Sequence, residues 1–175
     1  VNNIPVNRCT EKGIVVFNTP GANANGVKEL VIAGLLLSSR DITDSVNWAK
    51  TLIGKGDEVP ALIEKGKNNF AGQEIQGKTL AVIGLGAIGV LVANAAFALG
   101  MKVIGYDPYM SVKQALKLSN QVKWVEGIQA LLAQADYITL NIPLNAETKG
   151  YINREKFGMM KNDVRILNLS LIHIS

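Results

Sequence analysis

The sequence predicts an α/β fold with a doubly wound parallel sheet, and three observations predict it. From residue 78 onward, short apolar segments typical of strands alternate with segments typical of helices. The strand segments are apolar throughout, which indicates strands covered by helices on both faces. A glycine-rich turn over 84–89 joins the first of these strands to a helix. Alternation of this kind favours a parallel sheet.

The chain before residue 78 is less regular. A short buried strand is predicted over 13–18, ending at Thr19-Pro20-Gly21 because proline cannot donate to a ladder. A long helix is predicted from about residue 25 to residue 52, where no proline occurs. Its first half is apolar on nearly every side, so it has to be buried in a large core or at a subunit interface. The glycine-rich stretch 54–77 predicts a connection with a short helix at 61–65.

The region from residue 78 onward contains the regular part of the pattern. The predicted strands cover 79–83, 103–106, 122–125, 137–142 and 164–169. The predicted helices cover 88–99, 112–118, 128–134 and 154–160. We expect the connection before residue 78 to be the domain boundary.

Composition restricts the function classes. The chain has 175 residues and a formal net charge of +4, but its 18 Lys and Arg residues are scattered, which indicates solvated faces and no nucleic-acid partner. Cys9 is the only cysteine, so we expect neither an internal disulfide nor a metal site, and a reducing, cytoplasmic location. No signal peptide is recognisable at Val1, because the first residues are not basic and no apolar core follows.

The run from Leu80 to Met101 raises a membrane-spanning alternative. It contains 22 residues, and Asn94 is its only polar side chain. Glycines interrupt the run after a short β-branched segment, however, and the alternation of strands and helices continues beyond it. A buried strand, a glycine turn and a buried helix explain the run better. We therefore expect no membrane partner.

The glycine turn predicts a dinucleotide-binding domain of the Rossmann type. Gly84 allows the tight turn, Gly86 lets the backbone approach a pyrophosphate, and Gly89 lets the helix pack closely on the strand. Asp107 follows the second strand, 18 residues after Gly89, at the place where an acid binds the ribose hydroxyls and repels a 2′-phosphate. The predicted cofactor is therefore NAD. The alternative is a packing turn, with Asp107 capping the loop at Pro108.

Several segments together resemble one enzyme family, the D-isomer-specific 2-hydroxyacid dehydrogenases, over nearly the whole chain. They are Phe17-Asn18-Thr19-Pro20-Gly21-Ala22-Asn23-Ala24-Asn25 with Val27-Lys28-Glu29, then Gly72-Gln73-Glu74-Ile75-Gln76-Gly77-Lys78-Thr79, Gly105-Tyr106-Asp107-Pro108-Tyr109, Ile142-Pro143-Leu144 with Thr148-Lys149-Gly150 and Ile152, and Ile166-Leu167-Asn168-Leu169-Ser170. In that family a hydride passes between substrate C2 and the nicotinamide. A histidine paired with a glutamate moves the proton, and an arginine holds the substrate carboxylate.

The resemblance implies a set of cofactor-binding residues. Besides the glycines and Asp107, it implies Ala87 and Ile88 at the pyrophosphate, Pro108 at the ribose, and Ile142, Pro143 and Thr148 near the adenosine. A structural alternative for Pro143 and Thr148 is a loop start and a cap. Asn141 departs from the family, which often has histidine there.

The resemblance also implies what the chain lacks. The family's arginine would follow Ser170, but Leu171 stands there. Residues 169–175 resemble the translation of a transposon-end sequencing adaptor, so we expect 171–175 to be an artefactual tail. No catalytic residue is therefore assigned, and His173, the only histidine, is not taken as one. The expected organisation is a substrate-domain remnant at 1–20, a crossing helix and linker at 21–77, and a truncated NAD-binding domain at 78–170.

The implied substrate and partners follow from the same resemblance. A phosphorylated 2-hydroxy acid is the expected substrate, and a homodimer is expected to form through the 25–52 helix region. Two alternatives remain open. One is an enzyme for an unphosphorylated acid of the D-lactate or glyoxylate type, and the other is a non-catalytic, corepressor-like protein that senses NAD.

Overall fold

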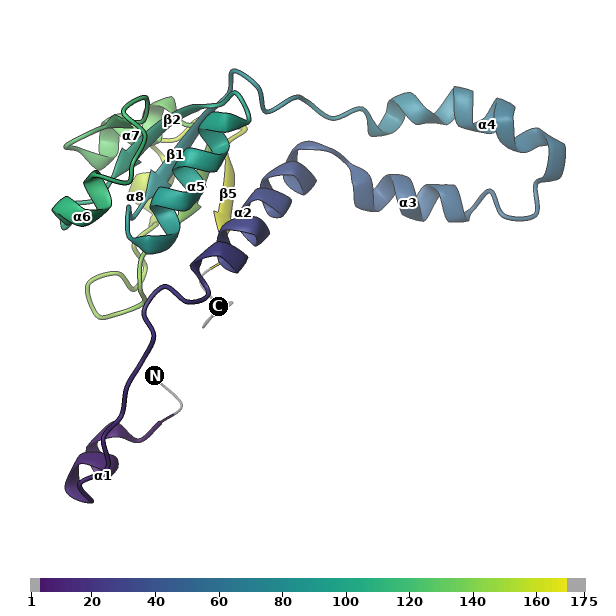
Figure 1. Ribbon diagram of the computed structural model, residues 1–175. Helices are drawn as coiled ribbons and strands as arrows, with labels where there is room; N and C mark the ends of the chain where they lie inside the picture. Colours follow the sequence, from purple (N-terminus) through teal and green to yellow (C-terminus); the bar gives the residue numbers. More distant parts are fainter. Residues whose placement is uncertain (1–3, 170–175) are drawn as a thin grey trace.

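Five parallel strands form the centre of the structure, a computed structural model that describes residues 4–169 (Figure 1). Their order across the sheet is β3-β2-β1-β4-β5, with β1 in the middle. The chain therefore builds one half of the sheet and then crosses back to build the other, which confirms the doubly wound fold. The strands are β1 (Thr79–Ile83), β2 (Lys102–Tyr106), β3 (Lys123–Trp124), β4 (Tyr137–Leu140) and β5 (Arg165–Asn168).

Helices cover both faces of this sheet. α2 (Ala24–Ser39) and α5 (Ala87–Ala98) lie on one face, and α7 (Ile128–Gln134) lies on the other (Figure 1). Leu80 and Val82 of β1 pack in the first layer, whereas Ala81 and Ile83 pack in the second. These four side chains are at most 1% exposed, and each large one contributes about 1.5–3 kcal/mol by leaving water. Burial on both sides explains why the strand is apolar throughout.

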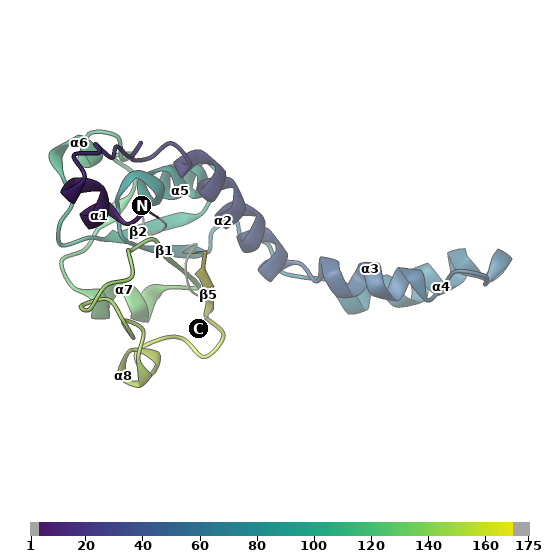
Figure 2. The same ribbon diagram turned by 90° about the horizontal axis from the view of Figure 1, so that it is seen from below.

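An arm of helices projects away from the sheet (Figures 1 and 2). It contains α3 (Ile42–Lys50), η1 (Gly56–Glu58), α4 (Val59–Gly66) and η2 (Lys67–Phe70). The Trp48 and Phe70 rings pack with their centroids 5.2 Å apart. Gly66 lies against Trp48, since a Cβ at this position would come within 2.2 Å of the indole. The packing of Trp48 against Phe70 and Gly66 thus holds the helices of the arm together.

The strand predicted over 13–18 is wrong. These residues follow α1 (Val6–Glu11) as an extended segment that pairs with none of the five strands. Ile14, Val15 and Phe17 are 55%, 71% and 86% exposed. The segment is apolar, but within residues 4–169 no neighbouring strand is present to receive its backbone hydrogen bonds.

The single helix predicted over 25–52 is also wrong, because it breaks into α2 and α3 after Ser39. Arg40 is extended, and Asp41 precedes the new helix. The chain that returns from the arm crosses at this break: the amide of Gln73 donates to the Ser39 carbonyl, 3.1 Å away. A Cβ on Gly72 would come within 2.0 Å of the same oxygen, so the crossing needs glycine. Leu30 and Leu37 are about half exposed, so this helix is not buried on every side within the single chain, and its burial at a subunit interface stays a prediction.

The remaining predicted elements are confirmed, with ends that shift by a few residues. The largest differences are shorter helices at α6 (Val112–Ala115) and α8 (Arg154–Phe157). The run from Leu80 to Met101 divides into β1, the glycine turn and α5, and none of the helices within residues 4–169 has the length and apolarity to cross a bilayer. Ser170 and the predicted tail at 171–175, with His173, lie outside the described residues.

Candidate functional site

The predicted site residues gather at the carboxyl edge of the sheet. β1 leads into Gly84, β2 into Asp107 and β4 into Asn141. Backbone bonds hold the three ends together: the Gly84 amide donates to the Tyr106 carbonyl at 2.9 Å, and the Asn141 amide donates to the Ile83 carbonyl at 2.8 Å. The chain adds β2 on one side of β1 and then crosses back to add β4 on the other side. Doubly wound sheets bind ligands at such a switch point.

The three glycines of the turn have different surroundings. Gly84 has φ +89°, and a Cβ there would meet the Asn141 carbonyl oxygen at 2.8 Å. A Cβ at Gly89 would lie 1.8 Å from the Gly84 carbonyl oxygen, so this glycine allows the helix to pack against the turn. Beside Gly86, by contrast, nothing lies within 4 Å of the Cβ position. The open space is where the sequence predicts a phosphate.

The N-terminus of α5 faces the same space. Gly86 is the N-cap residue, and no side chain caps the helix. The amides of Ala87 and Ile88 in the first turn are therefore available for an anion, and the helix dipole favours negative charge there. These features fit a pyrophosphate. Gly21, which the sequence reasoning did not assign to the site, lies beside Ala87, with 3.7 Å between the Cβ position and the Ala87 Cβ.

Asp107 holds the turn as well as facing it. Its Oδ2 accepts a hydrogen bond from the Leu85 amide and its Oδ1 accepts one from the Tyr109 amide, both at 2.8 Å. The carboxylate is only partly buried, and Pro108 beside it is exposed. Each carboxylate oxygen can accept a second bond, so the two backbone contacts leave capacity for the ribose hydroxyls. The sequence predicted the position of this acid but not its contact with Leu85.

The loop after β4 lies over the glycine turn. Ile142 Cγ2 is 2.9 Å from the Cβ position of Gly84. Further along, the Thr148 hydroxyl donates a hydrogen bond to the Pro143 carbonyl and accepts one from the backbone amide of Asn145. The side-chain oxygen of Asn145 in turn accepts a hydrogen bond from the backbone amide of Thr148. The structure thus gives Pro143 and Thr148 a loop-closing role, the structural alternative named above. Contact of these two residues with a cofactor stays a prediction.

Two tyrosines connect that loop to the end of β2, and sequence reasoning found neither. Burial, and then the charge and hydrogen bond of Tyr106, raise the pKa of Tyr151 above its ordinary value. The Lys156 ammonium lies 4.6 Å from the centre of the Tyr151 ring. Tyr106 immediately precedes Asp107, so the pair fixes the loop relative to Asp107.

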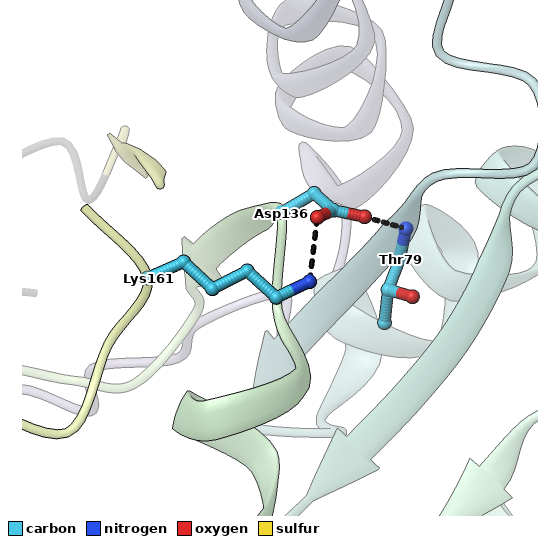
Figure 3. A network of polar contacts seen from close by, with 3 residues as sticks. All are labelled: Thr79, Asp136 and Lys161. Atoms are coloured by element: carbon cyan, nitrogen blue, oxygen red, sulfur yellow. Dashed lines mark hydrogen bonds and ion pairs between the residues drawn. The ribbon is translucent and has the colours of Figure 1, made fainter. Parts of the chain in front are cut away.

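The opposite, amino edge of the sheet has a different arrangement (Figure 3). Asp136 accepts a hydrogen bond from the Thr79 amide at 2.8 Å and pairs with the Lys161 ammonium at 2.7 Å. Burial raises the pKa of Asp136, but the bonds from Lys161 and Thr79 and the charges of Lys161 and Lys78 outweigh it and lower the pKa overall. This carboxylate joins β1, β4 and the segment before β5.

A hollow of about 290 Å³ also lies at the amino edge, between Thr79, Phe97 and Gln134. It does not overlap the glycine turn. The uncapped start of α5 and the Asp107 carboxylate lie at the carboxyl edge, so the cofactor is expected there and not in this hollow. Within residues 4–169 no group of three His, Cys, Asp or Glu side chains is arranged to hold a metal ion, and Cys9 is unpaired.

Comparison with known proteins identifies the family. Residues 34–171 match the family model described as D-isomer specific 2-hydroxyacid dehydrogenase, NAD binding domain. The chain is 40% identical over 168 residues to D-3-phosphoglycerate dehydrogenase of Methanocaldococcus jannaschii, covering 96% of this chain and 30% of that protein. It is 39% identical over 168 residues to hydroxypyruvate reductase of Thermotoga maritima, covering 96% and 49%.

Solved structures agree with this assignment. The structure is similar to apo D-lactate dehydrogenase from Escherichia coli, with a TM-score of 0.74, 27% identity, and coverage of 96% of this chain and 49% of that one. D-lactate dehydrogenase from Aquifex aeolicus, complexed with NAD and lactic acid, gives a TM-score of 0.72 at 29% identity, covering 96% and 46%. The chain spans between about a third and half of the length of these relatives. It belongs to the D-isomer-specific 2-hydroxyacid dehydrogenases and carries the NAD-binding domain of that family.

Proposed function

We propose that this chain is the NAD-binding part of a D-3-phosphoglycerate dehydrogenase, which oxidises 3-phosphoglycerate to 3-phosphohydroxypyruvate in serine biosynthesis. The observation that carries the cofactor role is the open space at Gly86 beside the uncapped start of α5, with Asp107 2.8 Å from the Leu85 amide. D-3-phosphoglycerate dehydrogenases among the relatives support the substrate. We also propose a cytoplasmic location, since a single cysteine suits a reducing compartment.

In this proposal the chain's own residues bind and orient the cofactor. NAD, when bound, accepts the hydride from substrate C2. The amides of Ala87 and Ile88 bind its pyrophosphate, and Gly86 leaves the room for it. Asp107 and Pro108 contact the adenosine ribose, and Ile142, Pro143 and Thr148 lie on the adenosine side. Residues 78–170 form this domain, 21–77 the crossing helix and linker, and 1–20 the remnant of a substrate domain.

Titration with NAD and NADP tests the cofactor assignment. We expect NAD to bind the chain more tightly than NADP, because the Asp107 carboxylate repels a 2′-phosphate. A tighter complex with NADP contradicts the assignment. The proposal also assigns no catalytic acid, base or arginine within the chain. Incubation of the chain alone with NAD and 3-phosphoglycerate is therefore expected to produce no NADH, and turnover above background contradicts this.

A hydroxypyruvate reductase is the second candidate, favoured by the 39% identity to the Thermotoga maritima enzyme. An enzyme containing this domain, supplied with NADH, distinguishes the two. We expect faster reduction of 3-phosphohydroxypyruvate than of hydroxypyruvate or pyruvate, since a site for a phosphate supplies basic or hydroxyl groups that a smaller acid does not use. Preference for hydroxypyruvate supports the second candidate, and preference for pyruvate supports an enzyme of the D-lactate type.

We further propose that two copies pair through α2 and α3, the region that the sequence predicts as the 25–52 helix. Leu30 and Leu37 lie seven residues apart on α2, Ile42 and Val46 lie four apart on α3, and each is at least 46% exposed. Such faces suit a two-fold interface between identical chains. Sedimentation equilibrium is expected to give a dimer, and Val46→Lys is expected to give a monomer. Leu116→Lys, directly after α6 and 83% exposed, is the matched control. A monomeric wild type contradicts the proposal.

A further inference from the structure

Asn94 has no role in the function proposed so far, although it is the only polar side chain between Leu80 and Met101. It lies in the second half of α5 and is partly buried. Its Nδ2 donates to the Lys117 carbonyl at 2.9 Å, and its Oδ1 accepts from the Ser119 amide at 2.9 Å. Both ends of the side-chain amide therefore bind the backbone on the two sides of one residue, in the connection between α6 and β3.

This connection is the far end of the segment that starts at Asp107. At the start, Asp107 accepts from the amides of Leu85 and Tyr109. In the middle, Ser111 caps α6, and the Leu118 amide continues the turn by donating to the Gln114 carbonyl at 3.1 Å. The segment is thus hydrogen-bonded at its start, in its middle and at its far end.

Apolar packing holds this segment only weakly. Tyr109, Val112 and Leu116 are 85%, 76% and 83% exposed. Met110 and Leu118 are the two side chains of the segment that pack against the core from its edge. With so little buried area, the polar ties at the two ends carry much of the segment's placement. One tie is Asp107 to the glycine turn, and the other is Asn94 to Lys117 and Ser119.

We propose that Asn94 is a positioning residue for the adenosine half of the NAD site. It fixes residues 117–119 to α5, and through the segment it keeps Asp107 and Pro108 aligned with the ribose. The inference rests on the proposed function, in which Asp107 takes the ribose hydroxyls. Asn94 lies on the same helix as the expected pyrophosphate site but seven residues after Ala87, so it acts on the cofactor through the 107–119 segment.

Calorimetric titration of the whole chain with NAD and with ADP-ribose tests this proposal. ADP-ribose is the probe for the adenosine half, since it lacks the nicotinamide. Asn94→Leu keeps similar volume but removes both hydrogen bonds, and we expect the Kd for both ligands to rise about five- to tenfold. Gln134→Ala is the matched control, because within residues 4–169 the Gln134 side chain bonds only to the Ala130 carbonyl of its own helix, at 2.6 Å. The control is expected to bind like the wild type.

Further readouts separate positioning from general destabilisation. Nicotinamide mononucleotide, used as a competitor, is expected to bind Asn94→Leu and the wild type equally, and the Ser119 amide is expected to exchange faster in Asn94→Leu. Asn94→Asp keeps the acceptor for Ser119 and is expected to show an intermediate Kd. Unchanged ADP-ribose affinity in a folded Asn94→Leu variant overturns the inference. An equal loss of affinity for ADP-ribose and for nicotinamide mononucleotide overturns it as well. Failure of the wild type to bind NAD at all overturns the proposed function itself.

Discussion

Two aspartates at opposite edges of the sheet show how the same contact can serve different ends. Asp107 accepts a hydrogen bond from the Leu85 amide, and Asp136 accepts one from the Thr79 amide, each at 2.8 Å. Asp136 also pairs with Lys161 at 2.7 Å, so a neighbouring cation balances its charge (Figure 3). Asp107 accepts a second backbone amide and has no ion pair within residues 4–169.

The difference indicates where a ligand belongs. A carboxylate with its own cation joins strands and gains little from an added group. A carboxylate beside an open glycine, without such a cation, keeps acceptor capacity for hydroxyl groups. We therefore propose that the amino edge stabilises the fold and that the carboxyl edge binds the cofactor. Four substitutions test this distinction.

Gly89→Ala is expected to have the largest effect, because it damages the packing and the site together. The new Cβ would lie 1.8 Å from the Gly84 carbonyl oxygen. We expect the free energy of unfolding to fall by about 2–3 kcal/mol, which lowers the melting temperature by about 5–10 °C in a chain of this size. Thermal unfolding followed by circular dichroism measures it. A melting temperature equal to that of the wild type would show that the turn can move.

Gly86→Ala adds the same atom three residues earlier, where nothing lies within 4 Å of it. The backbone there has φ −71°, so alanine is tolerated. We expect a nearly unchanged melting temperature but a Kd for NAD about a hundredfold higher, because the methyl group occupies space needed by the pyrophosphate. Normal NAD affinity in this variant would place the pyrophosphate elsewhere.

Asp107→Ala removes the ribose acceptor and the repulsion of a 2′-phosphate. NAD is expected to bind about tenfold more weakly, at the scale of one or two lost charge-assisted hydrogen bonds, whereas NADP affinity is expected to change little. The measurement is parallel titration with both cofactors, with Asp136→Ala as the control at the other edge. Retained selectivity for NAD in Asp107→Ala would assign discrimination to another residue.

Asp136→Asn is expected to have the smallest effect, on stability alone. It weakens one backbone bond and one half-exposed ion pair, worth about 1 kcal/mol together, and leaves NAD affinity unchanged. The pKa of Asp136 is lower in the folded chain than its ordinary value. Its contribution to the free energy of unfolding is therefore fully present at a pH above the ordinary carboxyl pKa, and it is lost as the pH falls through the pKa of the folded state. Urea unfolding at several acidic pH values should therefore show less acid sensitivity in Asp136→Asn, and equal sensitivity would exclude this role.

The parts of the fold that the sequence predicts are those whose partners lie within the described chain. β1 matches the predicted residues 79–83 because both faces of the strand are buried inside this domain. The failed strand at 13–18 has similar apolar residues, but they have no strand beside them here. The helix break had a local signal in the polar run from Ser38 to Asp41, with Asp41 at the N-cap position of α3. The long apolar stretch before that run concealed the signal.

The site divides in a similar way. Glycine spacing and the position of Asp107 follow from the backbone path of a strand, turn and helix, so the sequence predicts them. The contacts from Asp107 to Leu85, from Tyr151 to Tyr106 and from Asn94 to Ser119 join residues 22 or more positions apart. These contacts depend on how loops of particular lengths fold back onto the sheet, and no pattern of residues in the sequence predicts them.

The most direct test is to record which backbone amides change their chemical shifts when NAD is added to the isotopically labelled chain. Our account predicts that the largest changes occur at Leu85, Ala87 and Ile88, with smaller ones at Asp107 and Tyr109. At the amino edge, the amides of Thr79 and Lys161 are predicted to stay in place. Changes concentrated at Thr79, Gln134 and Lys161, with a silent glycine turn, would contradict it.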